Sequence, residues 1–142
     1  MMNVLLTVVL VAQPVPETWS LDRHRTVIVD VPVDIRRIVE DVLDYEEAEP
    51  IKGLAADLNG DRARDYVLQS ADRLCGNGGC VFVVVDGAAR KIIGQVLGSR
   101  VHLLARRSDG YPDIAVHTSR GAETAVDTMY RFDGRKYVAI PR

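Results

Sequence analysis

Apolar residues in the first third of the chain repeat with the period of a helix. Five of them follow the three-and-four spacing that places side chains on one helical face: Ile35, Ile38, Val39, Val42 and Leu43. Asp34 stands where its side chain can cap the first turn. Pro50 sets the far limit, because the residue before a proline is disfavoured in helical geometry. We therefore expect one amphipathic helix between Asp34 and Pro50.

From Tyr66 onward the pattern changes to short runs of β-branched residues separated by turn residues. The expected strands are 65–70, 80–85, 91–97, 100–105, 113–119, 124–132 and 136–140, preceded by one at 25–31. Dipeptides such as Asp86-Gly87 and Gly98-Ser99 separate them with residues that tolerate tight turns. Residues 81–85 are apolar throughout, so this strand should be central and covered on both faces. The predicted fold class is α+β: one N-terminal amphipathic helix packed on a twisted antiparallel β-sheet, arranged as a meander.

The first residues have the pattern of a targeting segment. Residues 4–12 form an apolar run that is too short to cross a bilayer, and Pro14 and Pro16 follow it. We expect a signal peptide over residues 1–12, an extension over 13–24 and a single α+β domain over 25–142. Because residues 1–3 contain no Lys or Arg, a buried N-terminal strand is the alternative. The signal peptide predicts an exported protein, periplasmic or secreted, whose mature chain is not inserted in a membrane.

Both cysteines lie in one glycine-rich segment, Cys75-Gly-Asn-Gly-Gly-Cys80. Its glycines allow the backbone to fold back so that the two sulfurs meet. In an oxidising compartment we expect a disulfide that pins this turn. A metal or redox pair is the weaker alternative, because no histidine or second cysteine pair lies nearby and the spacing is not Cys-x-x-Cys.

Composition and charge narrow the range of partners. The chain has 142 residues, 47% hydrophobic and 27% charged, which is ordinary for one globular domain. A net charge of -2 leaves no basic stripe for a phosphate backbone, which argues against nucleic acid as a partner. Between residues 30 and 61, ten acidic residues face only Arg36, Arg37 and Lys52. This skew suits a cation or a basic protein partner; the alternative is a solvated helix face.

The segment 57–65 has the residue spacing of a calcium loop. Acidic or amide side chains occupy alternate positions at Asp57, Asn59 and Asp61, and a further carboxylate follows at Asp65. Alternate side chains of a tightly curling loop can converge on one centre, where a calcium ion takes six to eight oxygen ligands. An EF-hand does not fit, because the glycine is at the fourth position and Leu68 stands where the bidentate glutamate belongs.

These nine residues resemble the calcium loops of FG-GAP and VCBS-type repeats, in which such a loop precedes a β-strand. The resemblance implies calcium as the ligand, with Asp57, Asn59, Asp61 and Asp65 as side-chain ligands and the Ala63 carbonyl as a fifth. Arg62 departs from the family pattern, which has glycine there. A left-handed conformation costs a non-glycine residue about 1 to 2 kcal/mol, so a different loop path is one expectation. The alternative to a metal site is a turn rich in Asp and Asn. In either case we expect this segment to join the helix to the sheet.

A partial echo of the loop occurs at residues 108–113, again before an expected strand. Asp109 and Asp113 repeat the separation of Asp61 and Asp65, but Ala105 and Arg107 replace the first two ligands. We therefore expect no metal in this copy. Our hypothesis is that the Arg107 guanidinium pairs with Asp113 in place of a cation. A simple turn between strands is the alternative.

Catalytic patterns are weak. His24, His102 and His117 lie in separate segments without metal-ligand spacing, and neither a nucleophile elbow nor a phosphate loop occurs. An enzyme is therefore the least supported class. The sequence favours an exported, non-enzymatic binding or structural protein with a weak calcium-binding loop. The alternative is an exported inhibitor or interaction module that uses the acidic helix face against a basic protein.

Overall fold

The computed structural model describes residues 19–119 and 125–141, which form two five-stranded antiparallel sheets and one α-helix. The first sheet has the order β2 (Val27–Ile28), β3 (Lys52–Ala56), β4 (Asp65–Gln69), β5 (Cys80–Asp86) and β6 (Lys91–Gly98). The second has the order β1 (Trp19–Asp22), β7 (Arg100–Ser108), β8 (Tyr111–Ser119), β9 (Ala125–Phe132) and β10 (Tyr137–Ala139). The helix α1 spans Val33–Leu43, and a short 3-10 helix, η1, spans Asp72–Leu74.

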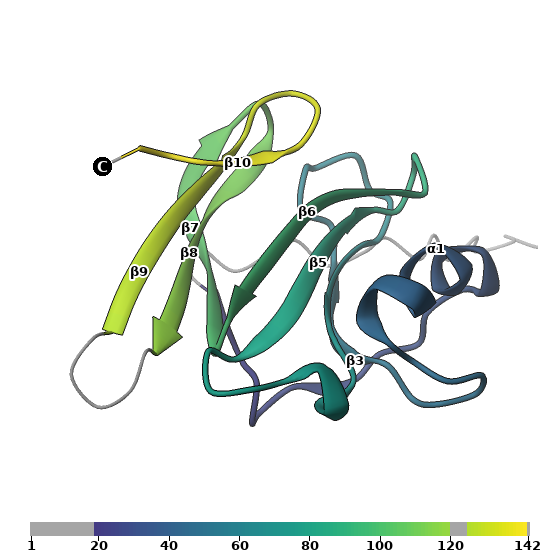
Figure 1. Ribbon diagram of the computed structural model, residues 1–142. Helices are drawn as coiled ribbons and strands as arrows, with labels where there is room; N and C mark the ends of the chain where they lie inside the picture. Colours follow the sequence, from purple (N-terminus) through teal and green to yellow (C-terminus); the bar gives the residue numbers. More distant parts are fainter. Residues whose placement is uncertain (1–18, 120–124, 142) are drawn as a thin grey trace, which may run out of the picture.

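The molecule has three layers, with α1 on one side, the first sheet in the middle and the second sheet on the other side (Figure 1). The core between the two sheets contains Leu58, Phe82, Val101, Leu103 and Ile114, all at most 1% exposed. A second cluster lies on the opposite face of the first sheet, where Ile35, Val39 and Leu43 of α1 are buried. The single helix and the antiparallel strands agree with the predicted α+β class.

Strand β5 shows why the middle layer needs apolar residues at consecutive positions. Phe82 and Val84 belong to the core between the sheets, whereas Val83 and Val85 belong to the cluster under the helix. The prediction that both faces of this strand are covered is confirmed. β5 is not the middle strand of its sheet, however, because only β6 lies beyond it.

The strands divide into two sheets rather than the single sheet expected from the meander pattern. The division falls at Gly98 and Ser99, where the chain leaves β6 and enters β7 of the other sheet. A Cβ atom on Gly98 would lie 2.5 Å from the Val116 side chain and 2.7 Å from the His117 carbonyl. The Ser99 amide donates to that same carbonyl at 2.8 Å. The glycine therefore allows the two sheets to approach at this corner, a role that a turn signal in the sequence does not reveal.

Two strands have no clear signal in the sequence. β1 lies inside the expected extension and pairs with β7, burying Leu21 in the core. β3 reads Lys-Gly-Leu-Ala-Ala, without β-branched residues, and its position is set by its neighbours. Gly53 is required there, because a Cβ atom would lie 2.2 Å from the Val67 carbonyl oxygen. Conversely, only Val27–Ile28 of the expected strand 25–31 is β-structure.

The helix ends differ from the expected ones. Pro32, not Asp34, occupies the N-cap, and no side chain caps the helix. Asp34 lies in the first turn, where its carboxylate accepts a hydrogen bond from the Ile35 amide and pairs with Arg90. The helix stops at Leu43, well before Pro50, because Asp44 adopts a left-handed conformation with φ of 59°.

The expected signal peptide over residues 1–12 lies outside the described residues, as does the segment 13–18 of the extension. Within the described part of the chain, no helix is long and apolar enough to cross a membrane.

Candidate metal-binding loop

The loop 57–64 connects β3 to β4 and lies at an end of both sheets. The expected connection from helix to sheet is therefore wrong, because α1 and the loop are separated by β3. Leu58 is fully buried in the core between the sheets and anchors the loop at its start. Asp65 anchors its other end as the first residue of β4, with no exposed surface. The candidate ligands are thus carried on a segment fixed at both ends.

Three carboxylates of this loop converge. Asp57, Asp61 and Asp65 each offer an oxygen, and these oxygens lie within 4.8 Å of one another. Calcium–oxygen distances are about 2.3–2.6 Å, so two ligands of one ion lie at most about 5.2 Å apart. Asp57 and Asp65 are buried, whereas Asp61 is exposed and leaves one side of the cluster open to solvent. The three residues can therefore hold one metal ion.

Side-chain oxygens of the loop accept hydrogen bonds from its own backbone. The Asp57 carboxylate accepts from the amides of Gly60 at 2.9 Å and Arg62 at 2.8 Å. The Asp61 carboxylate accepts from the Ala63 amide at 2.8 Å. These bonds give the loop its shape, as in a turn rich in Asp and Asn. They leave room for a cation, since a carboxylate has about four lone-pair sites.

The arginines of the loop do not replace the ion. Arg62 has a φ of 70°, so it adopts the left-handed conformation that glycine reaches at lower cost. Both Arg62 and Arg64 are exposed. Within the described residues, neither guanidinium forms an ion pair with the three carboxylates. These two charges therefore face solvent.

Asp65 is the most deeply buried carboxylate of the cluster. Its two oxygens accept hydrogen bonds from the amides of Leu58 at 2.9 Å and Gly87 at 3.0 Å. Burial raises the pKa of Asp65 to about 6, and the charges of Asp61 and Asp86 add to the increase, although the two amide bonds oppose it. Above that pH Asp65 is a buried carboxylate that forms no ion pair with any of the described residues. A bound cation would relieve this cost.

Asn59 and Ala63, the remaining expected ligands, form hydrogen bonds within the loop, and Asn59 also contacts the second sheet. The Asn59 side-chain oxygen accepts from the Asp61 amide at 3.1 Å, while its amide nitrogen donates to the Tyr111 hydroxyl at 3.2 Å. Asn59 therefore links the loop to β8 in the other sheet. Ala63 is half-buried in the loop, and its N–H is held by Asp61.

The echo of the loop is a two-residue hairpin turn. Asp109 and Gly110 have φ values of 48° and 85°, and Ser108 pairs with Tyr111 across the turn. Positive φ at both central residues is the geometry that Asp-Gly favours between antiparallel strands. The alternative of a simple turn is thus the arrangement found.

The expected pairing of Arg107 with Asp113 is wrong. The Arg107 guanidinium donates to the carbonyl of Leu58 at 2.6 Å and to the carbonyl of Gly110 at 2.9 Å. Asp113 instead accepts from the Ser108 hydroxyl at 2.7 Å and lies 3.5 Å from Arg106. The register of the hairpin gives the reason: Arg107 lies opposite Pro112 rather than Asp113, and its guanidinium faces carbonyl oxygens of the turn and of the calcium-type loop. Arg107 therefore joins the two related segments.

Three residues near the site carried no functional signal in the sequence. Gly87 clamps Asp65, and Asp86 adds negative charge beside it. Burial raises the pKa of Tyr111, and the charges of Asp65 and Asp86 add to the increase. The β4–β5 register explains the first two contacts, since the pairing of Tyr66 with Val85 brings the start of β4 beside the end of β5. A correct prediction of the β4–β5 register would therefore have placed Asp86 and Gly87 beside Asp65.

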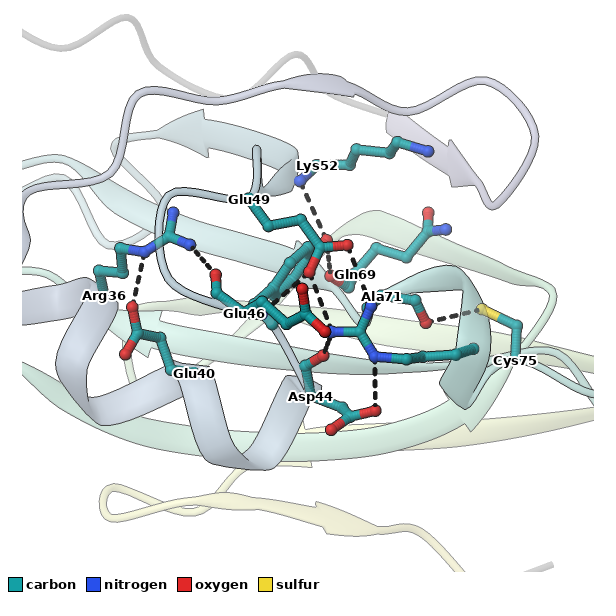
Figure 2. A network of polar contacts seen from close by, with 11 residues as sticks. Arg36, Glu40, Asp44, Glu46, Glu49, Lys52, Gln69, Ala71 and Cys75 are labelled. Atoms are coloured by element: carbon teal, nitrogen blue, oxygen red, sulfur yellow. Dashed lines mark hydrogen bonds and ion pairs between the residues drawn. The ribbon is translucent and has the colours of Figure 1, made fainter.

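Several acidic residues in and after α1 pair with arginines, one of which lies in the helix itself. Figure 2 shows Arg36 beside Glu40, and Asp44 and Glu49 turned toward one unlabelled guanidinium. This guanidinium belongs to Arg73, which lies 2.9 Å from each of the two carboxylates. Arg73 also donates to the Asp44 carbonyl. Because Arg73 lies far along the sequence in η1, the charge skew of the sequence overstates the acidity of this face. The contacts thus favour a structural role for these acids over a docking surface.

The disulfide between Cys75 and Cys80 is present, with Cα atoms 4.2 Å apart. Gly76 and Gly79 exchange two backbone hydrogen bonds inside the loop that it closes. The predicted pairing is confirmed. No cysteine is left for a metal or thiol site.

Comparison with known proteins adds no relative: no family model matches the chain, and no curated protein or solved structure matches it. The resemblance to FG-GAP and VCBS-type loops therefore rests on residues 57–65 alone. The geometry of the carboxylates in that segment has to carry the functional argument.

Proposed function

We propose that the loop 57–65 binds one calcium ion. We propose further that the chain is an exported, non-enzymatic binding or structural protein in which this ion fixes the loop against the two packed sheets. The observation that carries the proposal is the convergence of Asp57, Asp61 and Asp65, whose ligand oxygens lie within 4.8 Å of one another. Their all-oxygen chemistry suits a hard cation.

The ligand set favours calcium over magnesium. Magnesium demands near-ideal octahedral geometry at about 2.0–2.1 Å and dehydrates reluctantly, whereas calcium accepts irregular shells that include backbone carbonyls and water. Asp61 is exposed, so water completes the shell on that side. A site with one open side is expected to bind calcium with a dissociation constant of about 0.1–1 mM. Such an affinity suits a calcium-rich compartment outside the cytoplasm, in agreement with the export signal expected from residues 1–12.

The ion would act on the loop through charge. It would neutralise Asp65, which is buried with a pKa of about 6, and draw Asp57 and Asp61 into one fixed arrangement. Arg107 and Asn59 already connect this loop to the second sheet. Calcium binding would therefore make the contact between the two sheets more rigid. It would also make the exposed surface of the loop more rigid.

A stability measurement in calcium and in chelator tests the proposal. Calcium at ten times its dissociation constant should add about 1.4 kcal/mol to the free energy of unfolding by mass action. Asp57→Ala should abolish this increase. The matched control is Asp133→Ala, because Asp133 also accepts two backbone amide bonds, from Arg135 and Lys136, but lies in a different turn. It should keep the full calcium response. An unchanged stability of the natural protein in several millimolar calcium would defeat the proposal.

A further inference from the structure

A second candidate site lies where the start of β6 meets the turn between β9 and β10. It is a hollow of about 340 Å³ lined by Lys91, Ile92, Asp133, Arg135 and Lys136, and we call it the cationic hollow. Its volume is at the lower end of the range for small-molecule sites, about 300–1,000 Å³. The size suits one small molecule or one charged group of a larger ligand.

The charges in the cationic hollow are not balanced. Its lining has three cationic side chains and one carboxylate. One oxygen of that carboxylate, Asp133, accepts hydrogen bonds from the amides of Arg135 at 2.8 Å and Lys136 at 2.9 Å. The acid is thus occupied in shaping its own turn. Within the described residues, no carboxylate lies within ion-pair distance of Lys91, Arg135 or Lys136.

Several other cations of the molecule have acidic partners. Arg90, next to Lys91 in the chain, pairs with Asp34 at 2.7 Å, and Arg36 pairs with Glu40 at the same distance. Arg100 pairs with Asp22 at 3.2 Å. The cationic hollow differs because three cations without an ion pair among the described residues line one space, in a chain whose net charge is -2.

The two hairpins that form the cationic hollow are held firmly against each other. Tyr137 of β10 is buried, and its hydroxyl donates to the Pro112 carbonyl at 2.7 Å. Its ring lies against Gly94 of β6, where a Cβ atom would be 3.0 Å from a ring carbon. The backbone around the cationic side chains is thus arranged in advance, which lowers the entropic cost of binding a ligand.

We infer that the cationic hollow binds the phosphate group of a small phosphate monoester. Three positive charges against one negative leave an excess that a dianion neutralises, and a monoester carries nearly two negative charges at neutral pH. Arg135 offers a planar fork of donors and the two lysines offer point charges, the usual combination for phosphate oxygens. Ile92 gives the hollow an apolar wall for the rest of the ligand. This site does not depend on calcium binding by the loop 57–65.

Titration with glycerol phosphate, followed by amide chemical shifts in NMR spectra, tests the inference. The titration is done in chelator at fixed ionic strength, so that calcium plays no part. At pH 8, where the probe is a dianion, saturating shifts should occur at Lys91 and at residues 133–136, with a dissociation constant of about 1–10 mM. At pH 5, where the probe is a monoanion, binding should weaken. Acetate and glycerol should give no saturating shifts.

Three variants locate the binding site. Lys91→Met and Lys136→Met remove exposed charges without touching the core, and each should weaken glycerol phosphate binding about fivefold. Arg100→Met, which removes a paired charge elsewhere, should leave it within about twofold. The inference fails if the natural protein shows no saturating shifts at these residues, if acetate shifts them equally, or if Arg100→Met weakens binding as much as the lysine variants.

Discussion

The loop 57–65 and the hairpin 107–113 share one spacing of acidic residues but have different structures. In the loop, Asp57, Asp61 and Asp65 converge. In the hairpin, Asp109 and Gly110 form a two-residue turn, and Asp113 is satisfied by Ser108 and Arg106. The two segments nevertheless lie side by side, joined by Arg107 and by the contact between Asn59 and Tyr111.

The difference shows that the residues ahead of the shared spacing decide the chemistry. Asp57 organises the loop by accepting two of its amides, and Asp65 completes the cluster. The hairpin segment has Ala105 and Arg107 at the positions of Asp57 and Asn59, and the Arg107 cation binds carbonyl oxygens. One segment thus gathers negative charge that invites a metal ion, whereas the other is closed by protein groups alone.

The largest expected effect comes from breaking the clamp on Asp65 while leaving the hairpin intact. In Gly87→Ala the new Cβ atom would lie 1.7 Å from the Arg64 carbonyl oxygen, so the backbone of the loop must move. We expect a loss of about 3 kcal/mol in the free energy of unfolding, measured by denaturant titration. Gly76→Ala is the matched control, because its Cβ atom would meet nothing within 4 Å. Equal losses in the two variants would contradict the clamp.

The pKa of Asp65, raised to about 6 from its ordinary value of 3.8, predicts a pH dependence of the metal-free protein. Between these pH values the folded state holds a proton that the unfolded state has released, so stability falls as pH rises. Relative to Asp65→Asn, which does not titrate, the natural protein should lose up to about 3 kcal/mol between pH 4 and 6 and then level off. Chemical denaturation in chelator measures this difference. If the stability of the natural protein relative to Asp65→Asn stays constant or increases with pH, Asp65 does not have the raised pKa on which this prediction depends.

Removing the connection between the two segments should have an intermediate effect. Arg107→Met loses the bonds to Leu58 and Gly110 and leaves a carbonyl of the loop unpaired. We expect a cost of about 1–2 kcal/mol in unfolding free energy. Arg100→Met, which removes an exposed ion pair with Asp22, should cost less than about 1 kcal/mol. Similar costs for both would mean that Arg107 is only a surface charge.

The smallest effect concerns the two left-handed residues that distinguish the segments. Arg62 has a φ of 70° and Asp109 a φ of 48°. Aspartate tolerates this conformation better than arginine, so Arg62→Gly should stabilise the protein by about 0.5 kcal/mol and Asp109→Gly by less. Arg62→Gly should also tighten calcium binding, because a nearby positive charge is lost. Chemical denaturation of the two variants gives the order of the gains in unfolding free energy, and calcium titration gives their affinities. A larger gain in stability for Asp109→Gly than for Arg62→Gly would contradict the prediction.

Local patterns predicted elements that their own residues determine. The buried face of α1, the run 81–85 and the disulfide of Cys75 with Cys80 follow from periodicity, apolar content and glycine content. The sequence did not reveal β3, because glycine is required at position 53 by the close approach of the Val67 carbonyl, which belongs to another strand. The second sheet was missed for the same reason, since Gly98 looks like any turn residue.

The candidate site shows the same limit. Spacing alone brought Asp57, Asp61 and Asp65 together correctly. It could not give the partners of Asp65, because the Gly87 amide arrives through the pairing of β4 with β5. The spacing also gave the wrong partner for Arg107, because its actual partner Leu58 lies in the loop between β3 and β4 of the other sheet. Contacts between sheets depend on how the layers pack, which a one-dimensional pattern does not contain.

A calcium titration followed by NMR spectra of the backbone amides tests the central claim most directly. Our account predicts saturating shifts at Gly60, Arg62 and Ala63, whose amides bond to the loop carboxylates, and none of comparable size at Asp109 and Gly110. Residues 135 and 136, bonded to Asp133, are the internal reference for non-specific binding to a surface acid. Unchanged amides in the loop at about 10 mM calcium, or equal shifts at Arg135 and Lys136, would contradict a calcium site in this protein.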